Sequence, residues 1–298
     1  MKIIKTLKKN FSIKAIENIM TESKVKQYHE DGFAVLPNVF SKDYIEELKA
    51  EVANIVSKAD VKELKTKFDT GHSSAEDYFL DSGDKIRFFL EKDAFDKDGN
   101  LNYPLKDSIN KIGHAMHDIN SKFIKFSYSN EMKYIVSSIG YKKPILVQSM
   151  YIFKNARIGG EVPPHTDNTY IRTNPSSCMG IWVAFDDAES SNGGMWGVPG
   201  SHKTPTNWFL KLKSAHGKRY TVYEPAEKPE YDINKAVKLD VEKGSIILLH
   251  GDFVHFSHAN KSEKQRHAYT LHLVESQDHV YEADNWLQRK ELPFRYMY

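Results

Sequence analysis

The second half of the chain carries four short apolar runs that are rich in β-branched and aromatic residues. They are KPILVQSMYIFKN (143–155), MGIWVAFDDA (179–188), GSIILLHGDFVHFSHAN (244–260) and RHAYTLHLVES (266–276). Runs of this composition and length, bounded by Gly, Pro, Asn and Ser clusters, are typical of strands. The third run holds a Gly-Asp pair between two apolar stretches, so it predicts a strand, a turn and a second strand. Several short strands of this kind favour a sandwich or a barrel.

The first part of the chain has a different character, because its apolar residues recur at helical spacing. SKDYIEELKAEVANIVSKA (41–59) opens with a capping serine and predicts an amphipathic helix. SINKIGHAMHDINSKF (108–123) repeats the helical pattern, and NEMKYIVSSIGY (130–141) predicts a short helix that stops at its glycine. We find no repeat and no Gly/Ser linker. The sequence therefore predicts a single domain over residues 25–298, mainly β with flanking helices, in which a helical layer of about 140 residues precedes the strands.

The composition argues against several classes of protein. There are 42 basic and 40 acidic residues, and the net charge of +2 does not favour nucleic-acid binding. No apolar run approaches the roughly 18–20 residues of a membrane span. Cys178 is the one cysteine, so no internal disulfide forms. We interpret it as a small core residue in a reducing compartment. We expect a cytoplasmic monomer that acts on a small molecule.

The chain begins with a basic stretch, MKIIKTLKKNFSIKAIENIM, in which every lysine precedes the first acidic residue, Glu17. Mitochondrial presequences are also basic and amphipathic, but they favour Arg and Ser, which are scarce here. We interpret residues 1–24 as a basic N-terminal tail. A mitochondrial presequence is the alternative.

One motif points to metal chemistry. GGEVPPHTDN (159–168) places His165 and Asp167 two positions apart. In an extended segment, residues i and i+2 face the same side, so both side chains would reach one ion while Thr166 points away. Two ligands from one strand and a third from elsewhere form the facial triad of non-haem Fe(II) oxygenases. Taken alone, His-x-Asp also fits a surface turn.

The third ligand would come from HGDFVHFSHAN (250–260), which offers His250, His255 and His258. The residues alone leave the choice among these three open. An oxygenase that uses 2-oxoglutarate also needs a cation for the distal carboxylate, and the forked guanidinium of arginine suits this task. Arg266 begins the next predicted strand, eleven residues after His255, and a hairpin of that length would bring it alongside. The alternative is a solvated arginine at a strand end.

These motifs together resemble a known family. HTD (165–167), HGDFVHFSHAN and QRHAYTLH (265–272) are similar to the phytanoyl-CoA dioxygenase family of Fe(II)/2-oxoglutarate oxygenases, and NGGMWGVPGSH (192–202) is similar to a turn of that family. The resemblance is closest to the branch of phytanoyl-CoA dioxygenase domain-containing protein 1. It rests there on DYFLDSGDKIRFFLEKDAFD, SINKIGHAM, VQSMYIFK and DNWLQRKELPF, and it extends over residues 25–298.

The resemblance implies a double-stranded β-helix that binds Fe(2+), with 2-oxoglutarate and O2 as co-substrates. His165, Asp167 and His255 would bind the iron. It also implies hydroxylation of an undetermined small molecule with release of succinate and CO2, and ascorbate is a candidate reductant. Halogenating relatives carry a small residue at the position of Asp167. Because this chain keeps the carboxylate there, hydroxylation is the expected chemistry.

The resemblance further implies a set of contacts to 2-oxoglutarate. Arg266 would bind the distal carboxylate, assisted by Ser257, and Lys111, Met150 and Trp182 fall where the branch contacts the co-substrate. Each has a plainer alternative. Lys111 also fits a solvated lysine on a helix, Met150 and Trp182 fit strand core, and Ser257 fits the partner of a strand-edge amide.

Two other functions compete with this one. The first is a non-catalytic member of the same fold that binds a metal or a ligand, and the intact triad with Arg266 argues against it. The second is an acyl-CoA 2-hydroxylase, in which Lys211, Lys213, Lys218 and Arg219 would bind the phosphates. A solvated loop is the plainer interpretation of these four residues.

Overall fold

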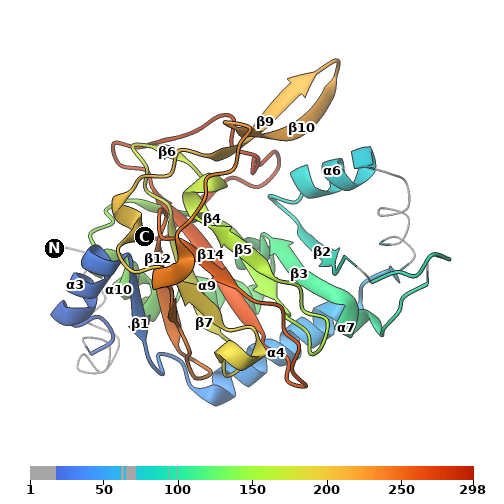
Figure 1. Cartoon of the computed structure of the whole chain (residues 1–298), viewed down its shortest axis with the longest axis horizontal. Coiled ribbons are helices and arrows are strands. Elements are labelled where there is room, and N and C mark those ends of the chain that lie inside the picture. The colour runs from blue at the N-terminus through green and yellow to red at the C-terminus, as the bar shows by residue number, and fades with distance from the viewer. Residues whose placement is uncertain (1–17, 62–63, 65–71, 93, 99) are drawn as a thin grey trace.

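The computed structural model describes residues 18–298 apart from 62–63, 65–71, 93 and 99 (Figure 1). The predicted basic tail lies outside the described residues as far as residue 17, and so does the alternative presequence. The end of that tail leads into the first described helix, α3 (Glu22–Asp31), which begins after the capping residue Thr21. None of the described helices is long and apolar enough to span a bilayer.

The described helices and strands have the following bounds. The other helices are α4 (Lys42–Ser57), α6 (His72–Leu80), α7 (Leu105–Ser108), α8 (Met116–Ile119), α9 (Ser121–Ser127) and α10 (Asn130–Ser138), with short turns η1 (Asp167–Thr169), η2 (Ser190–Asn192), η3 (Ser201–Lys203) and η4 (Ile233–Lys235). The strands are β1 (Phe33–Leu36), β2 (Ile86–Leu90), β3 (Ile109–His114), β4 (Pro144–Ile152), β5 (Val162–His165), β6 (Thr173–Asn174), β7 (Met179–Ala184), β8 (Met195–Gly197), β9 (Phe209–Ala215), β10 (Lys218–Glu224), β11 (Val237–Lys238), β12 (Ile246–His250), β13 (His255–Ser257), β14 (Ala268–Glu275), β15 (Val280–Tyr281) and β16 (Arg295–Tyr296).

Two antiparallel sheets form the centre of the fold. In the described part of the chain, the larger sheet has the order β1-β12-β7-β14-β4-β3-β2, with β16 paired to β4, and the smaller sheet has the order β11-β8-β13-β5. Two further strand pairs, β9–β10 and β6–β15, lie apart from both sheets. The two facing sheets form the double-stranded β-helix that we expected.

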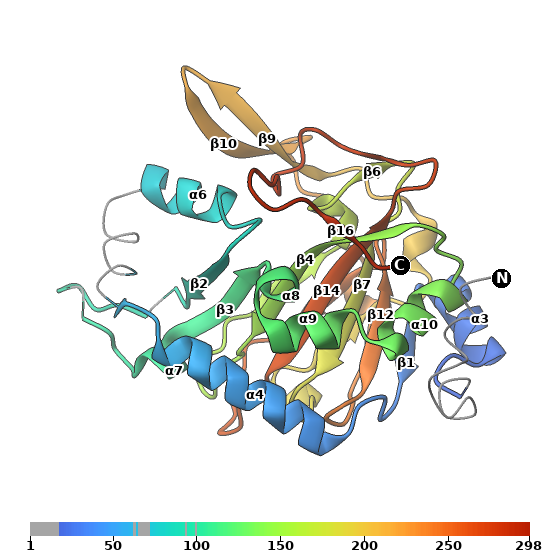
Figure 2. The ribbon, with the colours of Figure 1, turned by 180° about the vertical axis from the view of Figure 1, so that it is seen from behind.

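Helices cover one face of the larger sheet, and the smaller sheet lies over the other. Figure 2, the view from behind, shows α4, α8 and α9 on the near face of the larger sheet. Strand β14 shows how the sequence divides these two faces. Its residues Tyr269, Leu271 and Leu273 join the hydrophobic core beneath the helices, whereas Thr270 and His272 line a cavity on the opposite side. Because side chains alternate along a strand, one register fixes both the core and the cavity wall.

Most of the predicted elements are present. Helix α4 begins after Ser41, whose Oγ accepts a hydrogen bond from the backbone N–H of Tyr44. Helix α10 ends shortly before Gly140, whose φ of 101° is a conformation that glycine adopts without strain. The four apolar runs form β4, β7, β12 with β13, and β14. The strand, turn and strand predicted for residues 244–260 are therefore confirmed.

One predicted helix is wrong. In the run from residue 108 to 123, Ser108 ends α7, strand β3 follows from Ile109, and helix resumes only at Met116, in α8 and then α9. Strand β3 pairs with β2 on one side and with β4 on the other, so sheet pairing overrides the local helical spacing. Lys111 therefore lies on a strand. The N-terminal part is not purely helical either, because β1, β2 and β3 belong to the larger sheet.

The predicted hairpin between His255 and Arg266 is also wrong. Strand β13 pairs within the smaller sheet, whereas β14 pairs within the larger one. The connection therefore passes from one sheet to the other. Arg266 precedes β14 and reaches the cavity from the wall opposite His255.

Candidate active site

A cavity of about 520 Å³ lies between the two sheets. Its floor is the face of the larger sheet that points away from the helices, and its opposite wall comes from β5 and β13. Every residue that the resemblance assigns to the iron or to 2-oxoglutarate lines this cavity. These residues are His165, Asp167, His255, Arg266, Lys111, Met150, Trp182 and Ser257.

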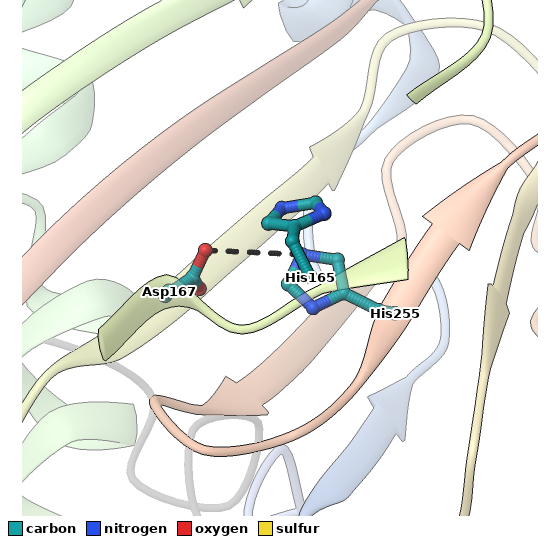
Figure 3. A group of neighbouring side chains, drawn as sticks. All are labelled: His165, Asp167 and His255. Carbon is teal, nitrogen blue, oxygen red and sulfur yellow. Dashed lines mark ion pairs between the residues drawn. The ribbon is translucent and has the colours of Figure 1, made fainter. Parts of the chain in front are cut away.

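Three side chains converge at one point of the cavity wall (Figure 3). His165 ends β5 and His255 begins β13, and the two residues are direct cross-strand partners. One ligand atom from each of His165, Asp167 and His255 lies within 4.8 Å of the other two. We predicted that Asp167 lies on the same strand as His165. It instead begins the turn η1. Thr166 between them is nevertheless extended, with φ −120° and ψ 148°, so positions 165 and 167 still face the same side.

Hydrogen bonds fix how the two imidazoles point. Nδ1 of His165 lies 2.9 Å from the carbonyl oxygen of Pro163, and Nδ1 of His255 lies 3.0 Å from that of Phe253. A carbonyl only accepts, so each Nδ1–H donates and each Nε2 keeps its lone pair for a metal. Burial, with the neighbouring His255, lowers the pKa of His165 to about 3. His165 is therefore neutral at physiological pH, as a metal ligand must be.

Asp167 is held by a histidine that we did not predict. Nε2 of His272 lies 3.2 Å from Oδ1 of Asp167, while Oδ2 is buried without a hydrogen-bond partner among the described residues. Burial alone would raise the pKa of Asp167, but His272 and His255 outweigh it and hold the pKa well below its usual range. Gly180 makes room for this arrangement, because a Cβ there would lie 2.7 Å from Oδ2.

The donor set fits a ferrous ion. Two imidazoles and one carboxylate, grouped on one side of a centre, leave further coordination positions for other ligands. The unpaired Oδ2 of Asp167 is the kind of buried acceptor that a cation satisfies. The two other candidate histidines lie elsewhere. His250 packs against His202 with ring centroids 5.1 Å apart, and His258 is an exposed residue beside Trp196.

Arg266 supplies a buried cation to the same cavity. Its side chain is enclosed, and its guanidinium lies 5.3 Å from the ring centroid of Trp182. Nε and Nη2 donate to the carbonyl of Gly193 at 3.2 and 2.7 Å, whereas Nη1 is buried without an acceptor among the described residues. Burial lowers the pKa of Arg266 to about 10, so it stays charged. A buried guanidinium with a spare N–H is suited to a carboxylate.

The floor of the cavity carries the other predicted contacts, and among them Trp182 lies beside Arg266. Met150, Thr270 and Trp182 are cross-strand partners on β4, β14 and β7, so they form one row across the sheet. Lys111 projects from β3 and lies 5.4 Å from the ring centroid of Phe89. Burial lowers the pKa of Lys111. The strand pairing thus brings together residues that lie more than a hundred positions apart in the sequence.

Ser257 has a partner that sequence reasoning missed. Its Oγ accepts a hydrogen bond of 2.8 Å from Nζ of Lys154, a buried lysine that also lines the cavity. Lys154 is the last residue of the VQSMYIFK stretch, and in the sequence it cannot be told from an ordinary charged residue at a strand end. His272 was also missed. The alternation of side chains along the strand could have predicted it, because positions 266, 268, 270 and 272 share one side of an extended segment.

The opposite end of the cavity is aromatic. Phe79 and Trp286 stack with ring centroids 4.1 Å apart, and Trp208 and Tyr223 stack at 4.1 Å as well. All four rings line the cavity. They come from α6, from the β9–β10 hairpin with the residue before it, and from the segment that follows β15, which lie at the edge of the fold (Figure 1). This end suits an apolar or planar group.

The chain is similar to known proteins over most of its length. The family model for phytanoyl-CoA dioxygenase (PhyH) matches residues 28–268. The Arabidopsis thaliana protein named phytanoyl-CoA dioxygenase is 38% identical, over 93% of this chain and 97% of its own length. The Bos taurus protein named phytanoyl-CoA dioxygenase domain-containing protein 1 is 40% identical, over 94% of this chain and 99% of its own length.

Solved structures share the fold at much lower identity. The epimerase SnoN from nogalamycin biosynthesis, described as non-heme and alpha ketoglutarate dependent, aligns with a TM-score of 0.61 at 14% identity, over 96% of this chain and 99% of its own. EctD from S. alaskensis, solved with 2-oxoglutarate and 5-hydroxyectoine, aligns with a TM-score of 0.58 at 16% identity, over 86% and 77%. At these identities the likeness shows the double-stranded β-helix alone.

Proposed function

The chain belongs to the phytanoyl-CoA dioxygenase family, and from that premise we propose that it is an Fe(II)- and 2-oxoglutarate-dependent dioxygenase. It hydroxylates a small molecule and releases succinate and CO2. The observation that carries the proposal is the convergence of His165, Asp167 and His255, with ligand atoms within 4.8 Å of one another, in a cavity that also contains the buried Arg266.

The protein contributes position and charge in this proposal. His165 and His255 present Nε2 to the iron because their Nδ1–H groups are tied to backbone carbonyls. Asp167 presents Oδ2 because His272 holds Oδ1. Bound iron supplies O2 activation coupled to the oxidative decarboxylation of 2-oxoglutarate, which no side chain performs. Since the position of Asp167 keeps its carboxylate, we propose hydroxylation rather than halogenation.

We assign the charged end of the cavity to 2-oxoglutarate. Arg266 binds the distal carboxylate through the N–H that has no protein acceptor, and Ser257 assists. Lys111, Met150 and Trp182 line the same cavity, and we assign them further contacts to the co-substrate. Ascorbate is the reductant that we would add to keep the iron ferrous.

We assign the aromatic end to the substrate, which stays undetermined. Three of the four hairpin residues that an acyl-CoA would use are already paired with carboxylates. Lys211 and Lys213 each lie 2.8 Å from a carboxylate oxygen of Glu224, and Arg219 lies 2.9 Å from Asp81. Phosphates would have to displace these carboxylates. We therefore propose a small substrate ahead of a coenzyme A thioester.

The single cysteine agrees with the compartment that we propose. Cys178 is buried and free, and burial raises its pKa well above the usual range. A thiol of this kind is inert and persists in a reducing environment. We keep the cytoplasm and the monomeric state as parts of the proposal, to be tested by localisation of the tagged full chain and by sedimentation.

The test is succinate release under Fe(II) and O2. Wild-type protein is incubated with 2-oxoglutarate and ascorbate, first alone and then with fractions of a cell metabolite pool. We expect iron-dependent succinate in both cases and a higher rate with the fraction that holds the substrate. A non-catalytic member of the fold would bind 2-oxoglutarate and release no succinate at any iron concentration.

A further inference from the structure

Lys154 is a buried lysine that the proposed function has not used. It lies just after β4, its side chain is 2% exposed, and it lines the cavity. Its φ is 41°, in the left-handed region, where a residue with a side chain is strained and glycine is favoured. A strained, buried lysine costs stability twice, so the position calls for an explanation.

The ammonium of Lys154 is aimed at the co-substrate end. Nζ donates to Oγ of Ser257 at 2.8 Å and to the carbonyl oxygen of Gly160 at 2.5 Å. An ammonium has three donors, so one N–H remains. Because Lys154 donates to the oxygen of Ser257, the hydroxyl proton of Ser257 is free to point to another acceptor. Ser257 lines the cavity.

Lys154 shares this end of the cavity with Arg266, and the two meet around Gly193. The carbonyl of Gly193 accepts both hydrogen bonds of Arg266, and a Cβ on Gly193 would lie 2.6 Å from Cε of Lys154. Among the residues that the structure describes, no carboxylate lies within ion-pairing distance of either cation. Glu91 and Glu161 act on Lys154 only at longer range, as Asp186 does on Arg266.

Two buried cations without a counterion repel each other, and burial penalises each of them. Burial first, and Arg266 second, lower the pKa of Lys154 to about 7. An anion placed between the two side chains removes both penalties. The proposed function brings one such anion to this end, namely the distal carboxylate of 2-oxoglutarate.

We propose that Lys154 is a second cation for the distal carboxylate of 2-oxoglutarate, which acts together with Arg266 and orients the hydroxyl of Ser257 toward that carboxylate. The inference rests on the proposed function. The rival explanation is structural, because the hydrogen bond from Lys154 to Gly160 also closes the loop after β4. The two explanations differ in what they predict for ligands without a distal carboxylate.

The experiment compares 2-oxoglutarate with pyruvate. Both are 2-oxo acids and chelate a metal through the same end, but pyruvate lacks the distal carboxylate. Binding is measured by calorimetry on the full chain loaded with Mn(II) in place of Fe(II), so that no turnover occurs. The variants are Lys154→Met, which keeps length and removes charge, and Lys261→Met, the same change at an exposed position.

We expect Lys154→Met to weaken 2-oxoglutarate binding about tenfold or more, as for the loss of a charge-assisted hydrogen bond. Its affinity for pyruvate and its Tm should stay at wild-type values, and Lys261→Met should change neither ligand. Ser257→Ala should also weaken 2-oxoglutarate. The double variant should lose less than the product of the two single effects, because the residues act as a unit.

Proton uptake gives a second readout that a structural lysine would not move. The free-state pKa of Lys154 is about 7, and a bound carboxylate raises it. Binding above pH 7 therefore takes up protons, and 2-oxoglutarate affinity falls as pH rises from that value toward the raised pKa. Calorimetry in buffers of different ionisation enthalpy should show uptake in wild type and little in Lys154→Met.

The outcomes separate two failures. If wild-type protein with Mn(II) does not bind 2-oxoglutarate, the proposed function itself is wrong. If wild type binds it and Lys154→Met binds it equally, the inference about Lys154 is overturned. Equal losses for 2-oxoglutarate and pyruvate, with a lower Tm, overturn it in favour of the loop explanation. Should Lys154→Met not fold, absence of proton uptake in wild type overturns it.

Discussion

The two ends of the cavity are built from different parts of the molecule. The charged end, around Arg266, Ser257 and Lys154, stands on or beside strands of the two central sheets. The aromatic end comes from α6, the β9–β10 hairpin and the segment after β15, at the edge of the fold (Figure 1). Strand pairing fixes positions within narrow limits, whereas appended loops and hairpins tolerate change. We therefore expect the proposed reaction to depend on residues of the sheets, and the choice of substrate to depend on residues of the periphery.

The largest expected effect comes from removing a proposed iron ligand, because the proposed reaction depends on the iron. His255→Ala removes one of three proposed ligands from β13, and we expect iron-dependent succinate release to fall more than about 100-fold. The measurement is 2-oxoglutarate turnover at saturating Fe(II). His258→Ala, at an exposed position three residues on, is the matched control and should retain wild-type activity. Turnover of His255→Ala at the wild-type rate would refute the ligand assignment.

Arg266 tests the charged end by itself. Arg266→Ala leaves the iron group intact but removes the buried guanidinium, so the apparent KM for 2-oxoglutarate should rise by about 10- to 100-fold. The rate at saturating 2-oxoglutarate should fall less. Arg266→Lys should recover part of the loss, since it restores charge without the fork. An unchanged KM in Arg266→Ala would remove its assigned role.

A substitution of His272 tests whether this residue positions the proposed iron ligand Asp167. His272→Leu removes the partner of Asp167 Oδ1, and we expect iron affinity to weaken by about 10-fold, the lower range for residues that orient a metal ligand. Metal titration with equilibrium dialysis measures this directly. His272→Gln keeps an N–H donor and should recover most of the affinity. If both variants bind iron as wild type does, His272 does not position Asp167.

The smallest effect on basal chemistry belongs to the aromatic end. Trp208→Ala removes one ring of a stacked pair, and substrate-free succinate release should stay within about twofold of wild type, because the iron and 2-oxoglutarate contacts are untouched. Stimulation by the active metabolite fraction should drop. A large loss of substrate-free turnover would show that the two ends are not separate.

The sequence predicted the long strands well, because β4, β7 and β14 are apolar runs whose character needs no information from elsewhere. Strand β3 was missed because Ile109, Ile112 and Met116 happen to match helical spacing, while its pairing with β2 and β4 is non-local. The connection from β13 to β14 was misjudged for a related reason. Loop length does not reveal whether two strands share a sheet or face each other.

The site shows the same division. His165 and Asp167 were singled out because their residue types and spacing suit a metal site. The resemblance resolved the choice among His250, His255 and His258 and assigned Arg266 its role, whereas the hairpin expected to bring Arg266 beside His255 was wrong. Lys154 and His272 were missed because the roles that we propose for them depend on burial and on which neighbours the sheets bring near. The sequence does not show whether a lysine is buried or exposed.

The most direct test of the central claim is an anaerobic Fe(II) titration of wild-type protein with 2-oxoglutarate present, followed by the visible charge-transfer absorption of a chelated 2-oxo acid. We predict a band that saturates at one iron per chain, that needs 2-oxoglutarate, and that is lost in His255→Ala. A protein that shows no band, or shows it equally in His255→Ala, would contradict the proposed iron centre.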